Sequence, residues 1–243
     1  MARPIGKIRK EVVESFLSQL LAGSSRSLVL CAYLFGSVLR GDAEEDSDID
    51  ILIVASRELD RVRDEAAAAA LTTLFESGKR VEPIVVSLEE LREGRGYFFR
   101  EVLKEKEEVY RMGEEELRKE EARNFLLLAL EYLDSSKKAF SSGSLRLSLD
   151  GAYNAVELCL KGFLRLKGKE IPRRQGSIVS AFSEEYIKNG PLTRELGRRL
   201  NKALETRSQA RYEYTFQVLK EDNEEILTLA EELCHLLEER LET

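Results

Sequence analysis

The chain has 243 residues, of which 45 are Asp or Glu and 38 are Lys or Arg, and its formal charge is −7. This acidic balance argues against general nucleic-acid binding, and the single histidine, His235, excludes any mechanism that needs two imidazoles. No apolar run reaches the roughly 18 residues of a membrane span, so we expect a cytoplasmic protein without a membrane partner. The cysteines Cys31, Cys159 and Cys234 lie far apart in apolar stretches, which predicts buried thiols instead of a zinc site or disulfides.

The first half of the chain alternates between helical and extended patterns. Apolar residues at helical spacing predict helices, and short apolar runs predict buried strands. The expected elements, in chain order, are a helix over 5–22, strands at 28–34 and 49–54, a helix over 58–77, and a strand at 81–86. A short helix over 97–103 and an edge strand at 109–112 complete this part. We therefore expect an α+β domain over residues 1–112, built from a small mixed sheet with helices.

From Glu114 onward the pattern is helical only. Gly143, Gly168 and the Gly190-Pro191 pair divide this part into segments with helical periodicity. The expected helices are 114–141, 145–167, 176–188, 192–213 and 216–241. An all-α helical bundle over residues 113–243 is therefore predicted to follow the first domain, since the chain is long enough for two modest cores.

The segment between the first two strands joins a Gly-Ser pair, Gly36 and Ser37, to a D-x-D pair, Asp48 and Asp50. Two carboxylates two residues apart on a strand point to the same face, and a divalent cation would relieve their repulsion. Glycine lets the backbone approach a ligand, and a short helix from Ser37 would direct N–H groups at an anion. A site that can bind both a divalent metal and an anion indicates a nucleoside triphosphate as the ligand. The alternative interpretation is a solvated acidic turn.

This spacing resembles the minimal nucleotidyltransferases of the polymerase-beta-like superfamily. The resemblance implies that Asp48 and Asp50 bind Mg²⁺ (or Mn²⁺), with a third carboxylate on a later strand. Glu82 is the candidate, because Pro83 pushes the residue before it into an extended conformation. Members of the family often carry Asp at this position.

The same resemblance assigns the triphosphate contacts and the reaction. Gly36 and Ser37 would contact the triphosphate of ATP or another nucleoside triphosphate, and Arg40 is a candidate phosphate contact. The implied chemistry is an attack by an acceptor hydroxyl on the α-phosphate, in which Glu82 helps position a metal or accepts the proton.

Four segments of the second half resemble a HEPN domain over about residues 120–241. They are ALEYLDSSKKAF, DGAYNAVE, GSIVSAFSEEYIK and RSQARYEY. HEPN ribonucleases carry an Arg followed five residues later by a His, whereas here Arg207 is followed at that spacing by Tyr212. RNA cleavage by this domain is therefore not expected. Arg207 would either pair with a carboxylate such as Glu157 or contact a ligand in a cleft.

Basic residues also gather in this half, and a solvated helix surface is favoured over a nucleic-acid site because Glu195 and Glu205 interrupt them. They are Arg173, Arg174, Arg194, Arg198, Arg199, Lys202 and Arg211.

Three functions are compatible with these features. The leading hypothesis is a nucleotidyltransferase that transfers a nucleoside monophosphate, foremost AMP from ATP, to a hydroxyl of a small molecule or protein, with the HEPN bundle forming the acceptor side. The second is a single-chain regulator, similar to HEPN toxin-antitoxin pairs, that adenylylates a HEPN tyrosine such as Tyr212 or Tyr214. The third is a nucleotide-binding sensor without turnover. The HEPN resemblance also implies a homodimer.

Overall fold

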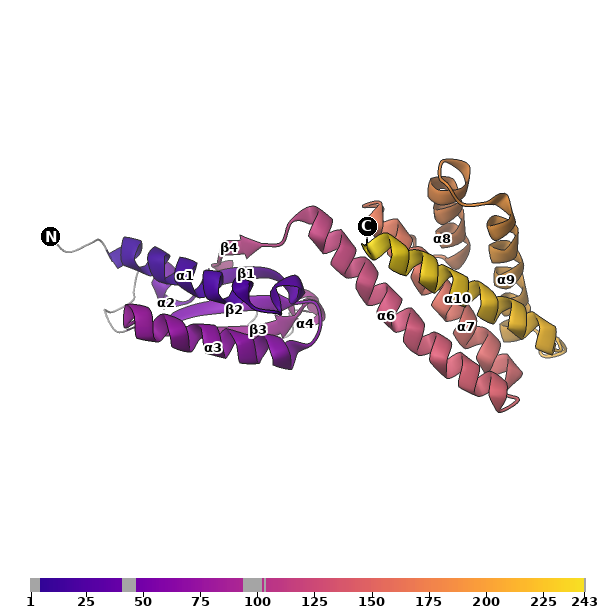
Figure 1. The fold of residues 1–243 in the computed structure, drawn as a ribbon, viewed down its shortest axis with the longest axis horizontal. Coiled ribbons are helices and arrows are strands. Elements are labelled where there is room, and N and C mark those ends of the chain that lie inside the picture. The colour runs from indigo at the N-terminus through magenta and orange to yellow at the C-terminus, as the bar shows by residue number, and fades with distance from the viewer. Residues whose placement is uncertain (1–4, 41–46, 94–101, 103, 243) are drawn as a thin grey trace. The chain divides into compact units, whose positions relative to one another are not determined.

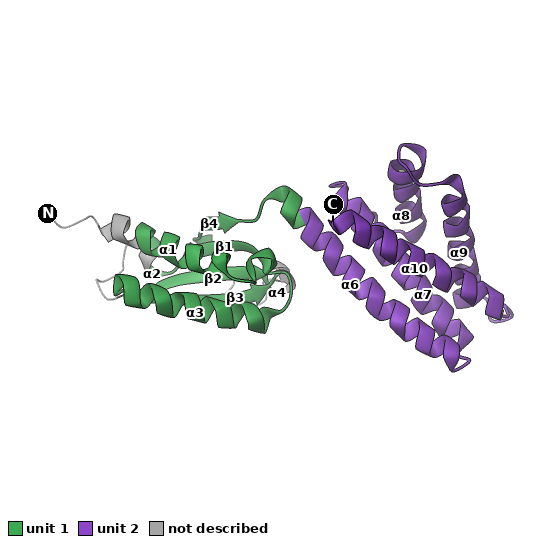
Figure 2. Ribbon diagram, in the orientation of Figure 1, with its two compact units in different colours: residues 1–117 green, residues 118–243 purple. Residues whose placement is uncertain are grey.

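The structure is a computed structural model that describes residues 5–40, 47–93, 102 and 104–242. Its residues form two compact units, Met1–Leu117 and Arg118–Thr243, and each unit has its own hydrophobic core (Figure 2). The units divide within α6 (Glu114–Ser141), whose first turn belongs to the first unit. A domain boundary after Met112 stays a prediction.

The described strands of the first unit form one mixed sheet in the order β3-β2-β1-β4 (Figure 1). The strands are β1 (Val29–Phe35), β2 (Ile49–Ala55), β3 (Val81–Ser87) and β4 (Glu107–Arg111). Strand β2 runs parallel to β3, whereas β1 is antiparallel to both β2 and β4. The expected mixed sheet is confirmed, with β3 and the expected edge strand, β4, at its edges. The short helix expected over 97–103 lies, apart from residue 102, outside the described residues.

Helices cover both faces of this sheet. The described helices are α1 (Ile5–Ala22), α2 (Ser37–Arg40), α3 (Leu59–Ser77) and α4 (Leu88–Glu93), with a 3-10 turn at Arg26–Leu28. On one face, Ile49, Ile51 and Ile53 of β2 pack in a core with α1 and α3. On the other face, Leu52 and Val54 pack with α4. Because side chains alternate along a strand, this pattern places Asp50 on the α4 face.

The second unit is a helical bundle, as expected from its periodicity. It contains most of α6, then α7 (Leu145–Leu166), α8 (Gln175–Phe182), a π-helical segment at Ser183–Lys188, α9 (Arg194–Tyr212) and α10 (Lys220–Glu242). The helix expected over 176–188 therefore changes its hydrogen-bond pattern at Ser183. Among the described residues, every helix is too short or too polar to traverse a lipid bilayer.

Aromatic rings fix the π-helical segment to the bundle core. Phe163, Phe182 and Tyr186 pack against one another with ring centroids 5.0 to 5.4 Å apart. The Tyr186 hydroxyl donates a hydrogen bond of 2.7 Å to the backbone oxygen of Phe163. The buried phenol thus has a partner, as a polar group in a core requires.

Candidate functional site

Asp50 occupies the second position of β2, where it has a neighbour on each side. Its Cα is in register with Phe35 of β1 and with Glu82 of β3. Residues in register on adjacent strands point to the same face, so the Asp50 and Glu82 side chains lie on the same, α4 face of the sheet. Two of the predicted site residues, 32 positions apart in the sequence, are thus neighbours in the sheet.

Gly36 lies directly against the Asp50 carboxylate. Its φ of +81° is in the left-handed region, and a Cβ built on it would lie 2.0 Å from Asp50 Oδ2. Glycine is therefore required here both for the backbone conformation and for space. Ser37 then opens α2, which confirms the expected short helix. The side chain of Arg40, at the end of α2, lies outside the part of the chain that the structure describes.

The close approach at Gly36 has a measurable consequence. Gly36→Ala should destabilise the first unit by about 2 kcal/mol or more and displace the Asp50 carboxylate, because it adds a steric clash to a strained φ. Gly78→Ala is the matched control, since Gly78 has a φ of +68° with nothing within 4 Å of a built Cβ. Chemical denaturation should show a smaller loss, about 1 kcal/mol, for the control. Equal losses in the two variants would contradict the steric argument.

Asp48 lies one residue before β2, so Asp50 is the member of the pair that belongs to the strand. The Asp48 side chain is 36% exposed, and its Oδ2 lies 3.8 Å from Nη1 of Arg80, just before β3. The backbone joins the same two segments, because the Ile49 N–H donates to the Arg80 oxygen at 2.9 Å. Asp48 is thus held at the start of β2, beside the residues that precede β3.

The donor set suits a hard cation such as Mg²⁺, although the described residues gather no group of three possible His, Cys, Asp or Glu ligands. Mg²⁺ usually binds through one or two carboxylates and completes its shell with water and substrate phosphates. Asp48 and Asp50 can supply such a pair, with the Gly36 backbone packed against one side of the Asp50 carboxylate. A metal site formed by Asp48, Asp50 and Glu82 together stays a prediction.

Arg207 of α9 is the buried charge of the second unit, with a side chain 4% exposed. Its Nε donates to Asp150 Oδ1 at 2.9 Å, and its Nη1 donates to Gln175 Oε1 at 2.8 Å. The expected salt bridge to a carboxylate is confirmed, but the partner is Asp150 and not Glu157, which was the example that the sequence offered. Glu157 Oε1 instead lies 2.7 Å from Lys161 Nζ on the same helix. Asp150 is two turns before Glu157 on α7, so both carboxylates are on the helix face that the sequence indicated.

A cavity of about 470 Å³ opens beside this ion pair. Its lining residues are Arg146, Leu147, Asp150, Arg207, Ala210 and Arg211. Sequence reasoning missed both Asp150 and Gln175. Asp150 opens the segment DGAYNAVE, which resembles a HEPN domain, whereas Gln175 lies one residue before the segment GSIVSAFSEEYIK. Arg207 is thus paired and also lines a cavity, so the two alternatives drawn from the sequence do not exclude each other.

The two candidate acceptor tyrosines are exposed. Tyr212 is the last residue of α9 and is 75% exposed, and Tyr214 follows the helix and is 95% exposed. Neither side chain lines the cavity beside Arg207. His235 lies on the surface of α10 with Nε2 3.3 Å from Glu239 Oε1, as expected for a helix-surface residue.

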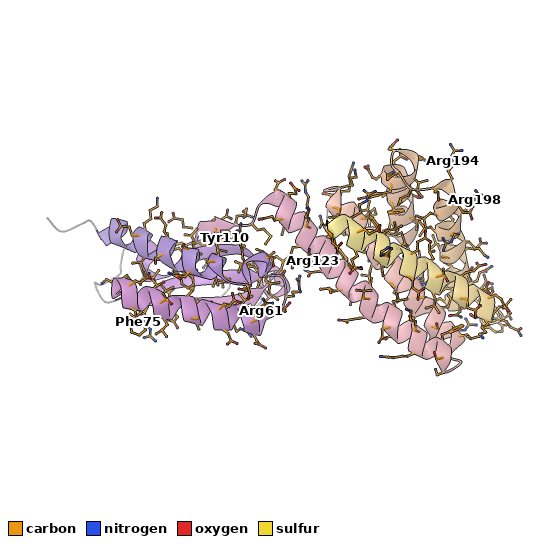
Figure 3. The ribbon with its side chains drawn as sticks, in the orientation of Figure 1. Arg61, Phe75, Tyr110, Arg123, Arg194 and Arg198 are labelled. Carbon is orange, nitrogen blue, oxygen red and sulfur yellow. The ribbon has the colours of Figure 1, made fainter. Side chains whose placement is uncertain are left out.

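Acidic neighbours neutralise much of the basic surface of α9. Arg199 pairs with Glu232 and Lys202 with Glu225, both across to α10, while Arg198 pairs with Glu195 of its own helix. Figure 3 shows Arg194 and Arg198 projecting from α9. The solvated, ion-paired surface favoured by the sequence therefore describes this helix better than a nucleic-acid site.

Comparison with known proteins matches each part of the chain to a protein family. Residues 22–115 match the family "Polymerase beta, Nucleotidyltransferase", and residues 122–240 match the family "HEPN domain". A protein of Methanocaldococcus jannaschii named "Putative toxin MJ0142" is 30% identical over 110 residues, which are 45% of this chain and 74% of that protein. A "UPF0332 protein" of Thermotoga maritima is 25% identical over 114 residues, 47% of this chain and 86% of that protein.

A solved structure spans nearly the whole chain at low similarity. The spectinomycin adenyltransferase of Enterococcus faecialis, with ATP and spectinomycin, covers 92% of this chain and 98% of its own at 16% identity and a TM-score of 0.31. The family matches follow the order of the two units along the chain. The chain belongs to the proteins that join a polymerase beta-type nucleotidyltransferase domain to a C-terminal HEPN domain.

Proposed function

We propose that this protein is a Mg²⁺-dependent nucleotidyltransferase that transfers AMP from ATP to a hydroxyl acceptor. One observation carries the proposal: the Gly-Ser segment, the D-x-D segment and the strand of Glu82 meet at Asp50. Gly36 is in contact with the Asp50 carboxylate, and Glu82 is in register with Asp50 on the adjacent strand. This convergence of three segments favours a nucleotide site over a solvated acidic turn, which needs no contact with Gly36 or with the strand of Glu82.

Each segment has a distinct role in this reaction. Gly36 and Ser37 bind the triphosphate, with Arg40 as a further phosphate contact, and Asp48, Asp50 and Glu82 are the metal ligands. When bound, Mg²⁺ supplies charge neutralisation at the attacking and leaving oxygens.

The exposed Glu82 carboxylate can also accept the proton of the acceptor hydroxyl. The acceptor oxygen then forms a bond to the α-phosphorus. The bond between the α-phosphorus and the bridging oxygen breaks, and pyrophosphate leaves.

The test is to incubate the full chain with Mg²⁺ and each of the four labelled ribonucleoside triphosphates, with and without candidate acceptors. We expect pyrophosphate release and transfer of label, highest for ATP, and loss of both on addition of EDTA. Intact-mass measurement in the same samples shows whether label joins the protein itself. Tight binding of ATP without pyrophosphate release, under every acceptor condition, would replace this proposal with the sensor hypothesis.

A second candidate function is favoured by the exposure of Tyr212 and Tyr214, which leaves both phenols open to solvent as acceptors. In that case the chain should gain one AMP increment in mass, and mutation of Tyr212→Phe together with Tyr214→Phe should abolish the gain. Tyr132→Phe is the control, because Tyr132 is also an exposed tyrosine but lies on α6, away in sequence from Tyr212 and Tyr214. An increment retained in the double variant would exclude these acceptors.

A further inference from the structure

Two cysteines on different helices meet in the core of the second unit. Cys159 of α7 and Cys234 of α10 are 75 positions apart, and their Sγ atoms are 3.5 Å apart, within hydrogen-bond distance. Both thiols are free and buried, with exposed fractions of 0% for Cys159 and 4% for Cys234. The predicted buried thiols are confirmed, and two of them form a pair that the sequence alone did not indicate.

The two helix backbones approach closely beside this pair. Gly162 and Leu237 each follow their cysteine by three residues, and a Cβ built on Gly162 would lie 2.6 Å from Leu237 Cδ2. The absence of a side chain at Gly162 therefore lets α7 and α10 pack at short range one turn from the thiols. A disulfide needs such close backbones, because its two Cα atoms are usually 4.4 to about 6.8 Å apart.

The thiol pair is also chemically asymmetric. Either thiol can donate the hydrogen bond that joins them. This hydrogen bond together with burial raises the pKa of Cys159 well above its usual value. The same hydrogen bond lowers the pKa of Cys234. Cys234 is thus the better thiolate of the two, and it is also the more exposed.

We propose that Cys159 and Cys234 are a site of oxidative modification, which a low-molecular-weight disulfide converts to an intramolecular disulfide between α7 and α10. In the first step the Cys234 thiolate attacks the reagent, forms a mixed disulfide and releases one thiolate. Cys159 then loses its proton and attacks Sγ of Cys234, forming the protein disulfide and releasing the second thiolate. The two protons of the protein thiols pass to the two released thiolates, and the reagent is reduced by two electrons.

The test uses the full chain carrying Cys31→Ala, so that the pair supplies its only thiols. After incubation with oxidised glutathione, we expect the intact mass to fall by two hydrogens and both thiols to resist alkylation after unfolding. Peptide mapping should recover the Cys159–Cys234 cross-link. The melting temperature of the second unit should rise by about 5 °C or more, because the link closes a long loop in the unfolded state.

Single variants provide the controls. Cys159→Ala should stop the reaction at a glutathione adduct on Cys234, and Cys234→Ala should leave Cys159 at least about tenfold slower to react because it is the more buried thiol. Two outcomes would overturn the proposal. In one, both thiols stay reduced in the folded chain while the same reagent oxidises them in urea. In the other, a glutathione adduct on Cys234 persists although Cys159 is present.

Discussion

Replacing Asp50 by Asn is expected to reduce nucleotidyl transfer by at least about 100-fold while leaving the fold intact. Asparagine has nearly the same shape as aspartate, so it fits beside Gly36 and in register with Glu82. It lacks the negative charge that a divalent cation needs from its ligand. The loss should appear in the rate of pyrophosphate release at saturating ATP and in a higher Mg²⁺ concentration for half-maximal rate.

Asp64→Asn is the matched control for this variant. Asp64 is exposed on α3, a helix that covers the face of the sheet opposite to Asp50. Its substitution should leave both the rate and the Mg²⁺ requirement unchanged, and both variants should keep the melting temperature of the parent chain. Unchanged pyrophosphate release in the Asp50→Asn protein would show that the transferase site lies elsewhere or that the measured activity is a contaminant.

Replacing Arg207 by Ala should destabilise the second unit by about 3 kcal/mol. The guanidinium is nearly fully buried and makes hydrogen bonds to Asp150 and Gln175, and both would lose this donor. The guanidinium carbon also lies over the ring of the buried Tyr153, 5.5 Å from the ring centroid. Because Asp150 is partly exposed and has Arg211 at 3.5 Å, we expect a loss at the lower end of the range for buried ion pairs.

Arg198→Ala on the same helix is the control for Arg207→Ala. Arg198 is 76% exposed and pairs with Glu195 one turn away, so its loss should cost under about 0.5 kcal/mol. Urea unfolding followed by circular dichroism measures both effects, and hydrogen exchange of α9 peptides assigns the transition to the second unit. Arg207→Lys should fall between the two, because one ammonium cannot reproduce the two-armed contact. Equal stability of the Arg207 and Arg198 variants would contradict a structural role for the buried pair.

Local features of this chain could be predicted from the sequence, because they depend on neighbouring residues. Helical periodicity gave the bounds of α1 and α6, and Gly78 ends α3 because its left-handed φ suits a helix end. Pro83 correctly favoured an extended Glu82. Asp48, in contrast, fell just outside the strand, since strand ends depend on pairing with a neighbour.

Non-local pairings could not be predicted in the same way. The register of Asp50 with Glu82 depends on how β3 aligns with β2 across a whole helix. Asp150 and Glu157 share one face of α7, so which of them pairs with Arg207 depends on how far α7 and α9 are shifted along their axes relative to each other. The Cys159–Cys234 pair likewise depends on how α7 and α10 pack. Each is set by tertiary packing, which no short sequence window contains.

The position of β3 at the edge of the sheet bears on how the candidate site assembles. A parallel strand can join β2 only after the chain has crossed over through α3, so Glu82 reaches Asp50 through a long loop closure. An edge strand is also held by one neighbour alone, and local opening of β3 costs less than opening of the central strands. Asp50 and Glu82 would therefore be among the last residues to come together during folding and among the first to separate under mild denaturant.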